Sequence, residues 1–223
     1  MSSNKTVFFL IGVLLAILGT SMLIPYSIQV LTQENSHSFI GASFITIFIG
    51  ILFILSNLEK QFKLNLQQTF LFSALAWFLI AAFGSLPFLL SPIPFSISEA
   101  FFESMSGITT TGATVIVNLE AKSHGILIWR ALLQWLGGVG IIVMALAVLP
   151  MLSIGGMQLF KTESYETPDK VVPKAASFAA GISIVYITLT IIWAFMLWGA
   201  GTVSYTHLRA HETDSYLVCR LLL

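Results

Sequence analysis

The stretch "SPIPFSISEAFFESMSGITTTGATVI", residues 91–116, lies between two long apolar runs and resembles neither of them. Two prolines at its start end the preceding run. Residues 96–106 then fit a short amphipathic helix about 16 Å long, roughly half a bilayer. A strip rich in hydroxyl groups, residues 109–116, follows without any charge. Helix, half-length helix, extended strip and helix is the layout of a re-entrant pore loop.

The half-length helix has residues suited to its two ends. Ser96 or Ser98 can serve as the N-cap, and Glu99 places a negative charge in the first turn. Gly107 is expected to end the helix, because glycine is common just beyond a helix C-terminus.

Composition sets the surroundings of this stretch. Of the 223 residues, 57% are hydrophobic and only 9% are charged, whereas soluble domains carry about 25% charged residues. We therefore expect an all-α integral membrane protein that spans the bilayer several times. The formal net charge of zero indicates no nucleic-acid partner.

Five apolar runs are long enough to cross a hydrocarbon layer of about 30 Å. The first is expected to be a retained span that ends at Pro25, not a cleaved signal peptide. The five runs are Val7–Ile24, Phe39–Leu58, Thr69–Leu90, Ile126–Pro150 and Phe178–Ala200.

The lysines predict the orientation of these spans. With the amino terminus in the cytoplasm, one side holds six lysines, and the other holds Lys122 with Arg130 near that face. Such an asymmetry fits the positive-inside rule, and it puts residues 91–125 on the outer side. The six cytoplasmic lysines are Lys5, Lys60, Lys63, Lys161, Lys170 and Lys174.

The strip has the chemistry to replace the hydration shell of a monovalent cation. An extended backbone arranges successive carbonyl oxygens along one line, as in potassium-selective filters. Gly112 is free to adopt a positive φ that turns carbonyls toward an ion. The negative C-terminal end of the half-length helix would favour cations at the same place. An ordinary outer loop is the alternative reading of the four residues 109–112.

Several other residues leave alternatives open. Glu99 and Glu103 could draw cations to a pore mouth, or could cap the helix and form hydrogen bonds behind the strip. Arg130 could snorkel or pair with an acid. In "WLGGVG", residues 135–140, the glycines could allow close helix packing or form a hinge.

The histidines suggest no strong metal site. His37 and His124 lie in outer loops without a partner at a ligand spacing. His207 and His211 are four residues apart, but that segment lacks the pattern of a zinc site. We expect no cofactor and no catalytic residue.

Two stretches, "FFESMSGITTTGATVI" at 101–116 and "WRALLQWLGGVGIIVMALAVLPMLSIGGMQLFKTE" at 129–163, resemble the first pore repeat of the TrkH/KtrB potassium-uptake transporters, closest to the TrkH type. The resemblance runs from about residue 5 to residue 200. It implies a helix pair followed by four helix–pore-loop–helix repeats around one potassium pathway. This chain would contain one filter strand of the four, with Gly112 as its glycine and Thr110 and Thr111 before it.

The same resemblance implies the surroundings and the partners. Potassium would be the transported substrate, and the location would be the inner membrane of a bacterial cell. The remaining pore repeats, a homodimer partner and a cytosolic nucleotide-binding regulatory ring are the expected protein partners.

The chain divides into five expected parts. Residues 1–65 form the two-helix unit, 66–152 the first repeat, and 153–177 a cytoplasmic linker. Residues 178–201 would be the first helix of a second, incomplete repeat. Residues 202–223 break the family pattern: "VSYTHLRAHET" resembles translated adapter sequence, so this tail is expected to be non-native and the chain an amino-terminal fragment.

Two rival functions remain. The chain could be a subunit of a small homotetrameric potassium channel, in which each copy gives one filter strand. It could also be a membrane-embedded enzyme, although no span contains paired acids, a nucleophile with a base, or a metal cluster.

Overall fold

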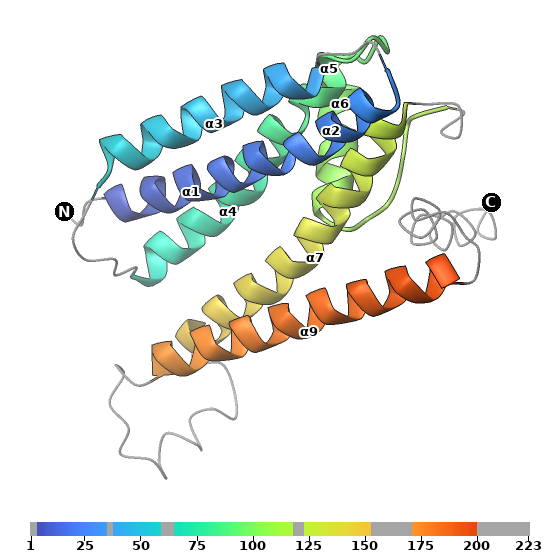
Figure 1. Ribbon diagram of the computed structural model, residues 1–223. Helices are drawn as coiled ribbons and strands as arrows, with labels where there is room; N and C mark the ends of the chain where they lie inside the picture. The colour runs from blue at the N-terminus through green and yellow to red at the C-terminus, as the bar shows by residue number, and fades with distance from the viewer. Residues whose placement is uncertain (1–3, 35–37, 59–64, 118–122, 153–170, 200–223) are drawn as a thin grey trace, which may run out of the picture. The chain divides into compact units, whose positions relative to one another are not determined.

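The computed structural model describes residues 4–34, 38–58, 65–117, 123–152 and 171–199. Every regular element in these ranges is an α-helix (Figure 1), which confirms the all-α expectation for this part of the chain. The helices are α1 (Lys5–Ser21), α2 (Leu23–Leu31), α3 (Ser38–Ser56), α4 (Leu66–Gly84), α5 (Leu86–Leu89), α6 (Ile97–Ile108), α7 (His124–Leu152) and α9 (Val171–Gly199).

The chain forms two compact units, and the division falls inside α7. The first unit holds the described residues up to Gly137, and the second begins at Gly138. The expected linker at 153–177 lies largely outside the described residues, as does the expected tail at 202–223.

Within the described residues, three stretches are long and apolar enough to cross a bilayer: Lys5–Leu31, Ser38–Ser56 and Gln67–Leu89. They correspond to the first three runs expected from the sequence. The fourth and fifth runs lie in α7 and α9, which have 29 residues each.

The expected end of the first span at Pro25 is wrong. The helical path is interrupted at Met22 and continues as α2 through Pro25 to Leu31. Pro25 is the third residue of α2, and the first residues of a helix need no backbone N–H partner within it. The proline therefore costs no hydrogen bond there.

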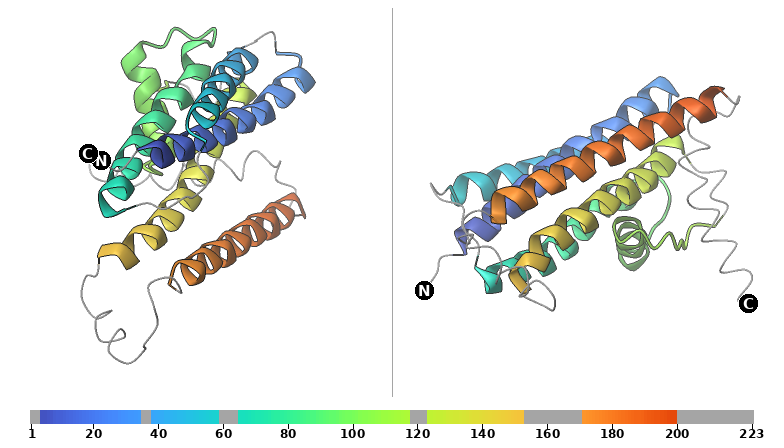
Figure 2. Two further views of the ribbon diagram at one scale, coloured as in Figure 1. Left: turned by 90° about the vertical axis from the view of Figure 1, so that its left-hand side faces the viewer. Right: turned by 90° about the horizontal axis from the view of Figure 1, so that it is seen from below.

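Glycines bring α1 and α3 into close contact in the first unit, where α1 also packs against α4 (Figures 1 and 2). A Cβ added at Gly12 would lie 2.7 Å from the carbonyl oxygen of Gly50. About two turns further along α1, the carbonyl of Gly19 accepts a hydrogen bond from the Ser43 hydroxyl of α3 at 2.7 Å. Close approach through small residues is a common way for helices to pack in membranes.

A buried tryptophan of α7 contacts both α3 and the end of α4. The indole Nε1 of Trp129 donates to the carbonyl of Gly84 at 2.9 Å, and its ring meets Phe39 edge-on with centroids 6.2 Å apart. Trp129, Phe39 and Phe88 are fully buried. This contact ties α7 to both α3 and the end of α4.

The second unit contains the rest of α7 and α9. A Cβ added at Gly138 would lie 2.9 Å from the hydroxyl oxygen of Tyr186, so the two helices approach closely there. Trp193, Phe195 and Met196 of α9 are all more than half exposed. A helix that carries large apolar side chains on its outside is typical of a membrane span.

Candidate functional site

Helix α6 begins with a capping box. The Ser96 hydroxyl accepts from the backbone N–H of Glu99, and the Glu99 carboxylate accepts from the backbone N–H of Ser96 at 2.8 Å. Of the two N-caps considered, Ser96 is therefore the one used. Glu99 acts as a cap, which was one of its two proposed roles.

Helix α6 ends two residues later than expected. It runs through Gly107 to Ile108, with Thr109 as the C-cap, so the prediction that Gly107 ends it is wrong. Gly107 is needed inside the helix instead, because a Cβ there would lie 3.0 Å from the Cβ of Leu133 on α7. At 12 residues, about 18 Å, α6 is too short to cross the bilayer.

The strip after α6 turns its backbone N–H groups back onto the helix. The N–H of Thr110 donates to Gly107 O at 2.9 Å, and those of Thr111 and Gly112 donate to Ser106 O at 3.0 and 3.3 Å. Gly112 has φ 76°, as expected, and Thr110 has φ 59°. A threonine rarely adopts this conformation, so the surroundings must hold it there.

The direction of the carbonyls follows from these bonds. In a trans peptide the C=O points opposite to the N–H of the next residue, and no cis peptide occurs in the described chain. The carbonyls of Thr109, Thr110 and Thr111 therefore point away from the end of α6. The Thr110 and Thr111 side chains are exposed. Residues 109–111 therefore direct their carbonyl oxygens away from α6.

A buried carboxylate holds the second half of the strip. Glu103 is 1% exposed, and its Oε1 accepts from the Thr114 hydroxyl at 2.7 Å and from the Val115 N–H at 2.6 Å. The Ser106 hydroxyl donates to the Ala113 carbonyl at 2.6 Å. Hydrogen bonds of two α6 side chains, Glu103 and Ser106, thus hold the strip against the helix.

Arg130 neutralises this carboxylate from α7. Its Nη1 forms an ion pair with Glu103 Oε2 and donates to the Thr114 hydroxyl at 2.9 Å, and the residue is 3% exposed. Of the roles proposed from the sequence, pairing with an acid holds for Arg130, and hydrogen bonding behind the strip holds for Glu103. Two buried charges are tolerated together because each compensates the other.

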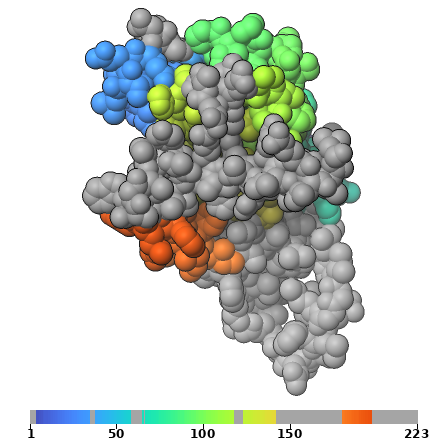
Figure 3. Space-filling model, turned by 90° about the vertical axis from the view of Figure 1, so that its right-hand side faces the viewer, coloured from blue at the N-terminus to red at the C-terminus, as the bar shows by residue number. Residues whose placement is uncertain are grey.

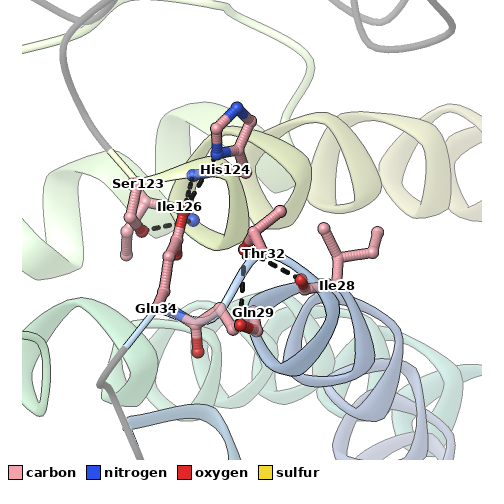
Figure 4. Close-up of polar contacts among 7 residues, drawn as sticks. All are labelled: Ile28, Gln29, Thr32, Glu34, Ser123, His124 and Ile126. Atoms are coloured by element: carbon pink, nitrogen blue, oxygen red, sulfur yellow. Dashed lines mark hydrogen bonds and ion pairs between the residues drawn. The ribbon is translucent and has the colours of Figure 1, made fainter.

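A second polar cluster joins α2 to the start of α7 (Figure 4). Glu34 Oε1 accepts from the backbone N–H of His124 at 2.9 Å and lies 3.0 Å from its Nδ1. In the space-filling view, the blue atoms of the α2 region lie beside the yellow-green atoms at the start of α7 (Figure 3). Sequence reasoning missed this contact, because 90 residues separate its members and no local spacing marks it.

The environment of Glu34 lowers its pKa. Burial alone would raise the pKa, but the hydrogen bonds from the His124 backbone and ring outweigh that effect. The cluster also places a carboxylate at the N-terminus of a 29-residue helix, where the dipole favours negative charge.

The other candidate histidines lie outside the described residues: His37, His207 and His211. Among the residues that are described, no group of three metal-ligating side chains comes together.

A family model described as "TrkH: Cation transport protein" matches residues 35–213. The chain belongs to the TrkH family. The TrkH match covers most of the chain, including the half-length helix and the strip that carried the resemblance.

Relatives within the TrkH family are named for potassium uptake. The Trk system potassium uptake protein TrkH of Vibrio parahaemolyticus is 38% identical over 205 residues, which cover 90% of this chain and 42% of the relative. The protein of the same name from Escherichia coli K12 is 37% identical over 196 residues, covering 86% and 41%. The chain thus spans about two-fifths of the length of these relatives.

A solved structure shares the fold. The crystal structure of the potassium transporter TrkH from Vibrio parahaemolyticus superposes with a TM-score of 0.80 at 35% sequence identity. The match covers 95% of this chain and 42% of that one. The assignment to the TrkH family, made from the motifs at 101–116 and 129–163, is confirmed.

Proposed function

We propose that this chain supplies one of four selectivity-filter strands in a TrkH-type potassium-uptake protein. Thr110, Thr111 and Gly112 would coordinate potassium through backbone carbonyl oxygens. The observation that carries the proposal is the carbonyl direction: the N–H groups of Thr110 to Gly112 bond back to α6, so the oxygens of Thr109 to Thr111 point outward.

The charges around the strip favour a cation. The C-terminal end of α6 carries partial negative charge beside the strip. A fully buried acid, Glu103, is paired with Arg130 and lies against the second half of the strip. Coordination would therefore depend on neutral carbonyls, which suit a monovalent ion that must be released again.

The proposal includes a membrane layout. Residues 66–152 form a helix, a re-entrant pore loop and a helix, preceded by the two-helix unit at residues 1–65. The pore loop faces the outside of a bacterial inner membrane. The short α6, which is capped at its start and followed by a strip that first turns back on the end of the helix, supports this layout.

One strand cannot surround an ion, so the proposal requires the remaining repeats. We propose that the chain is part of a longer protein, since its relatives are more than twice its length. That protein would work as a homodimer with a cytosolic nucleotide-binding ring, as the family resemblance implies.

Gly112→Ser in the full-length parent tests the filter strand. The added side chain disfavours the φ of 76° at this position, so potassium uptake should become less selective over sodium. The measurement is potassium uptake in cells that depend on it, with sodium as competitor. Gly41→Ser, on α3, is the control, because a Cβ there meets only Leu90 at an ordinary 3.7 Å. Unchanged competition in Gly112→Ser would refute the filter assignment.

A further inference from the structure

The glycines of "WLGGVG" differ in what surrounds them. A Cβ added at Gly137 would overlap the carbonyl oxygen of Ile108 and lie 2.7 Å from its carbonyl carbon. A Cβ at Gly138 would instead meet the Tyr186 hydroxyl, and one at Gly140 would meet nothing within 4 Å in the described residues. Gly137 is thus the member of the group that touches α6.

The atoms near Gly137 are backbone atoms. A flexible side chain could rotate away from a new methyl group, but the carbonyl of Ile108 cannot move without moving the end of α6. Ile108 is 3% exposed, so it has little free space around it. In a closely packed interior, such an overlap displaces the neighbouring segment.

Helix α7 supports the end of α6 at two positions on one face. Leu133 lies against Gly107, and four residues later Gly137 lies against Ile108. Residues four apart lie on the same side of a helix. The last turn of α6 therefore rests on a surface formed by one large side chain and one glycine.

The end of α6 in turn holds the strip. Ile108 directly precedes Thr109, and the N–H groups of Thr110 to Gly112 bond to the carbonyls of Ser106 and Gly107. A shift of the last turn of α6 would therefore carry the outward-pointing carbonyls with it. Backbone contacts connect Gly137 to the strip without a flexible link between them.

We infer that Gly137 is a positioning residue: its bare Cα sets the place of the filter carbonyls, so discrimination between potassium and other monovalent cations depends on it. The inference rests on the proposed function of the strip. It assigns Gly137 a supporting role that separates it from Gly138 and Gly140, which the sequence alone could not distinguish.

The test compares Gly137→Ala with Gly140→Ala in the full-length parent. Both variants place the same methyl group in the same helix, three residues apart, and both gain the same intrinsic helix propensity. The measured quantity is the ratio of potassium to sodium uptake, which does not depend on the amount of protein. Gly137→Ala should lower this ratio by roughly tenfold, the scale on which one methyl group alters discrimination in a packed site. Gly140→Ala should leave it unchanged.

A second variant keeps the test decisive if Gly137→Ala fails to accumulate in membranes. A Cβ at Gly107 would lie 3.0 Å from the Cβ of Leu133, so Gly107→Ala presses the last turn of α6 away from the same face of α7 more gently and should lower the ratio by a smaller factor. Equal ratios in the parent, Gly137→Ala and Gly140→Ala would overturn the inference. If Gly137→Ala does not accumulate, an unchanged ratio in Gly107→Ala would overturn it.

Gly112→Ser, measured in parallel, separates this inference from the proposed function. If Gly112→Ser lowers the ratio and Gly137→Ala does not, the filter assignment stands and the supporting role of Gly137 is wrong. If Gly112→Ser also leaves the ratio unchanged, the strip is not the filter and both proposals fail.

Discussion

Glu103 and Arg130 show how single residues hold the strip in place. Both are almost fully buried, and together they contact the hydroxyl of Thr114 from two sides. A lone charge at this depth would be costly, whereas the pair is compensated. The network therefore acts as a neutral support whose two halves depend on each other.

Removing one member of this pair should be more harmful than removing both. Arg130→Met leaves the Glu103 carboxylate buried without its partner, so we expect a loss of about 3–5 kcal/mol in stability. Adding Glu103→Gln to Arg130→Met should restore much of that loss, because no buried charge remains. The measurement is the thermal unfolding midpoint of the purified full-length protein in detergent. A double variant less stable than Arg130→Met would contradict the account of the pair.

At the scale of elements, the sequence predicted what local spacing encodes. A serine N-cap at 96 or 98 with Glu99 in the first turn marked the start of α6, and glycine at 112 marked a positive φ. Three identical threonines gave no sign that Thr110 would also adopt one. The structure decides it, because bonds from the strip to Ser106 and Gly107 fix that turn.

Long-range contacts carry no such local signal. The pairing of Glu34 with His124 joins segments 90 residues apart, and the pairing of Glu103 with Arg130 could be stated only as one alternative. The prediction that the first span ends at Pro25 is wrong for a different reason. A proline near a helix start is tolerated, so Pro25 did not end the helix.

The contact between α2 and α7 should make stability depend on pH. The folded pKa of Glu34 lies below its unfolded value of about 4.3. Its contribution is therefore present above that unfolded value and is lost as the pH falls through the folded pKa. Glu34→Gln should remove this acid-dependent part, about 0.3–1 kcal/mol for a carboxylate at a helix N-terminus.

The measurement is the unfolding midpoint in detergent at a series of pH values between about 3 and 6. Thr32→Val is the matched control, since Thr32 lies on the same turn and its hydroxyl donates only within α2, to Ile28 and Gln29 (Figure 4). An identical acid dependence in the parent and in Glu34→Gln would show that Glu34 does not contribute.

For the whole molecule, the described chain combines spanning helices with one half-length helix and its strip. Three stretches have the length and hydropathy of spans, while α6 has 12 residues. The likeness to the Vibrio parahaemolyticus transporter covers 95% of this chain and 42% of that structure. In the proposed function, the strip is therefore one part of a site that other repeats complete.

The most direct test of the filter assignment is to locate a bound ion in the full-length parent. Rubidium or thallium, which replace potassium and scatter anomalously, would be soaked into crystals of that protein. The account predicts an ion within about 3 Å of the carbonyl oxygens of Thr110 and Thr111, a distance suited to coordination of a large monovalent cation by carbonyls. An ion bound in the pathway by other groups, with none at these carbonyls, would contradict it.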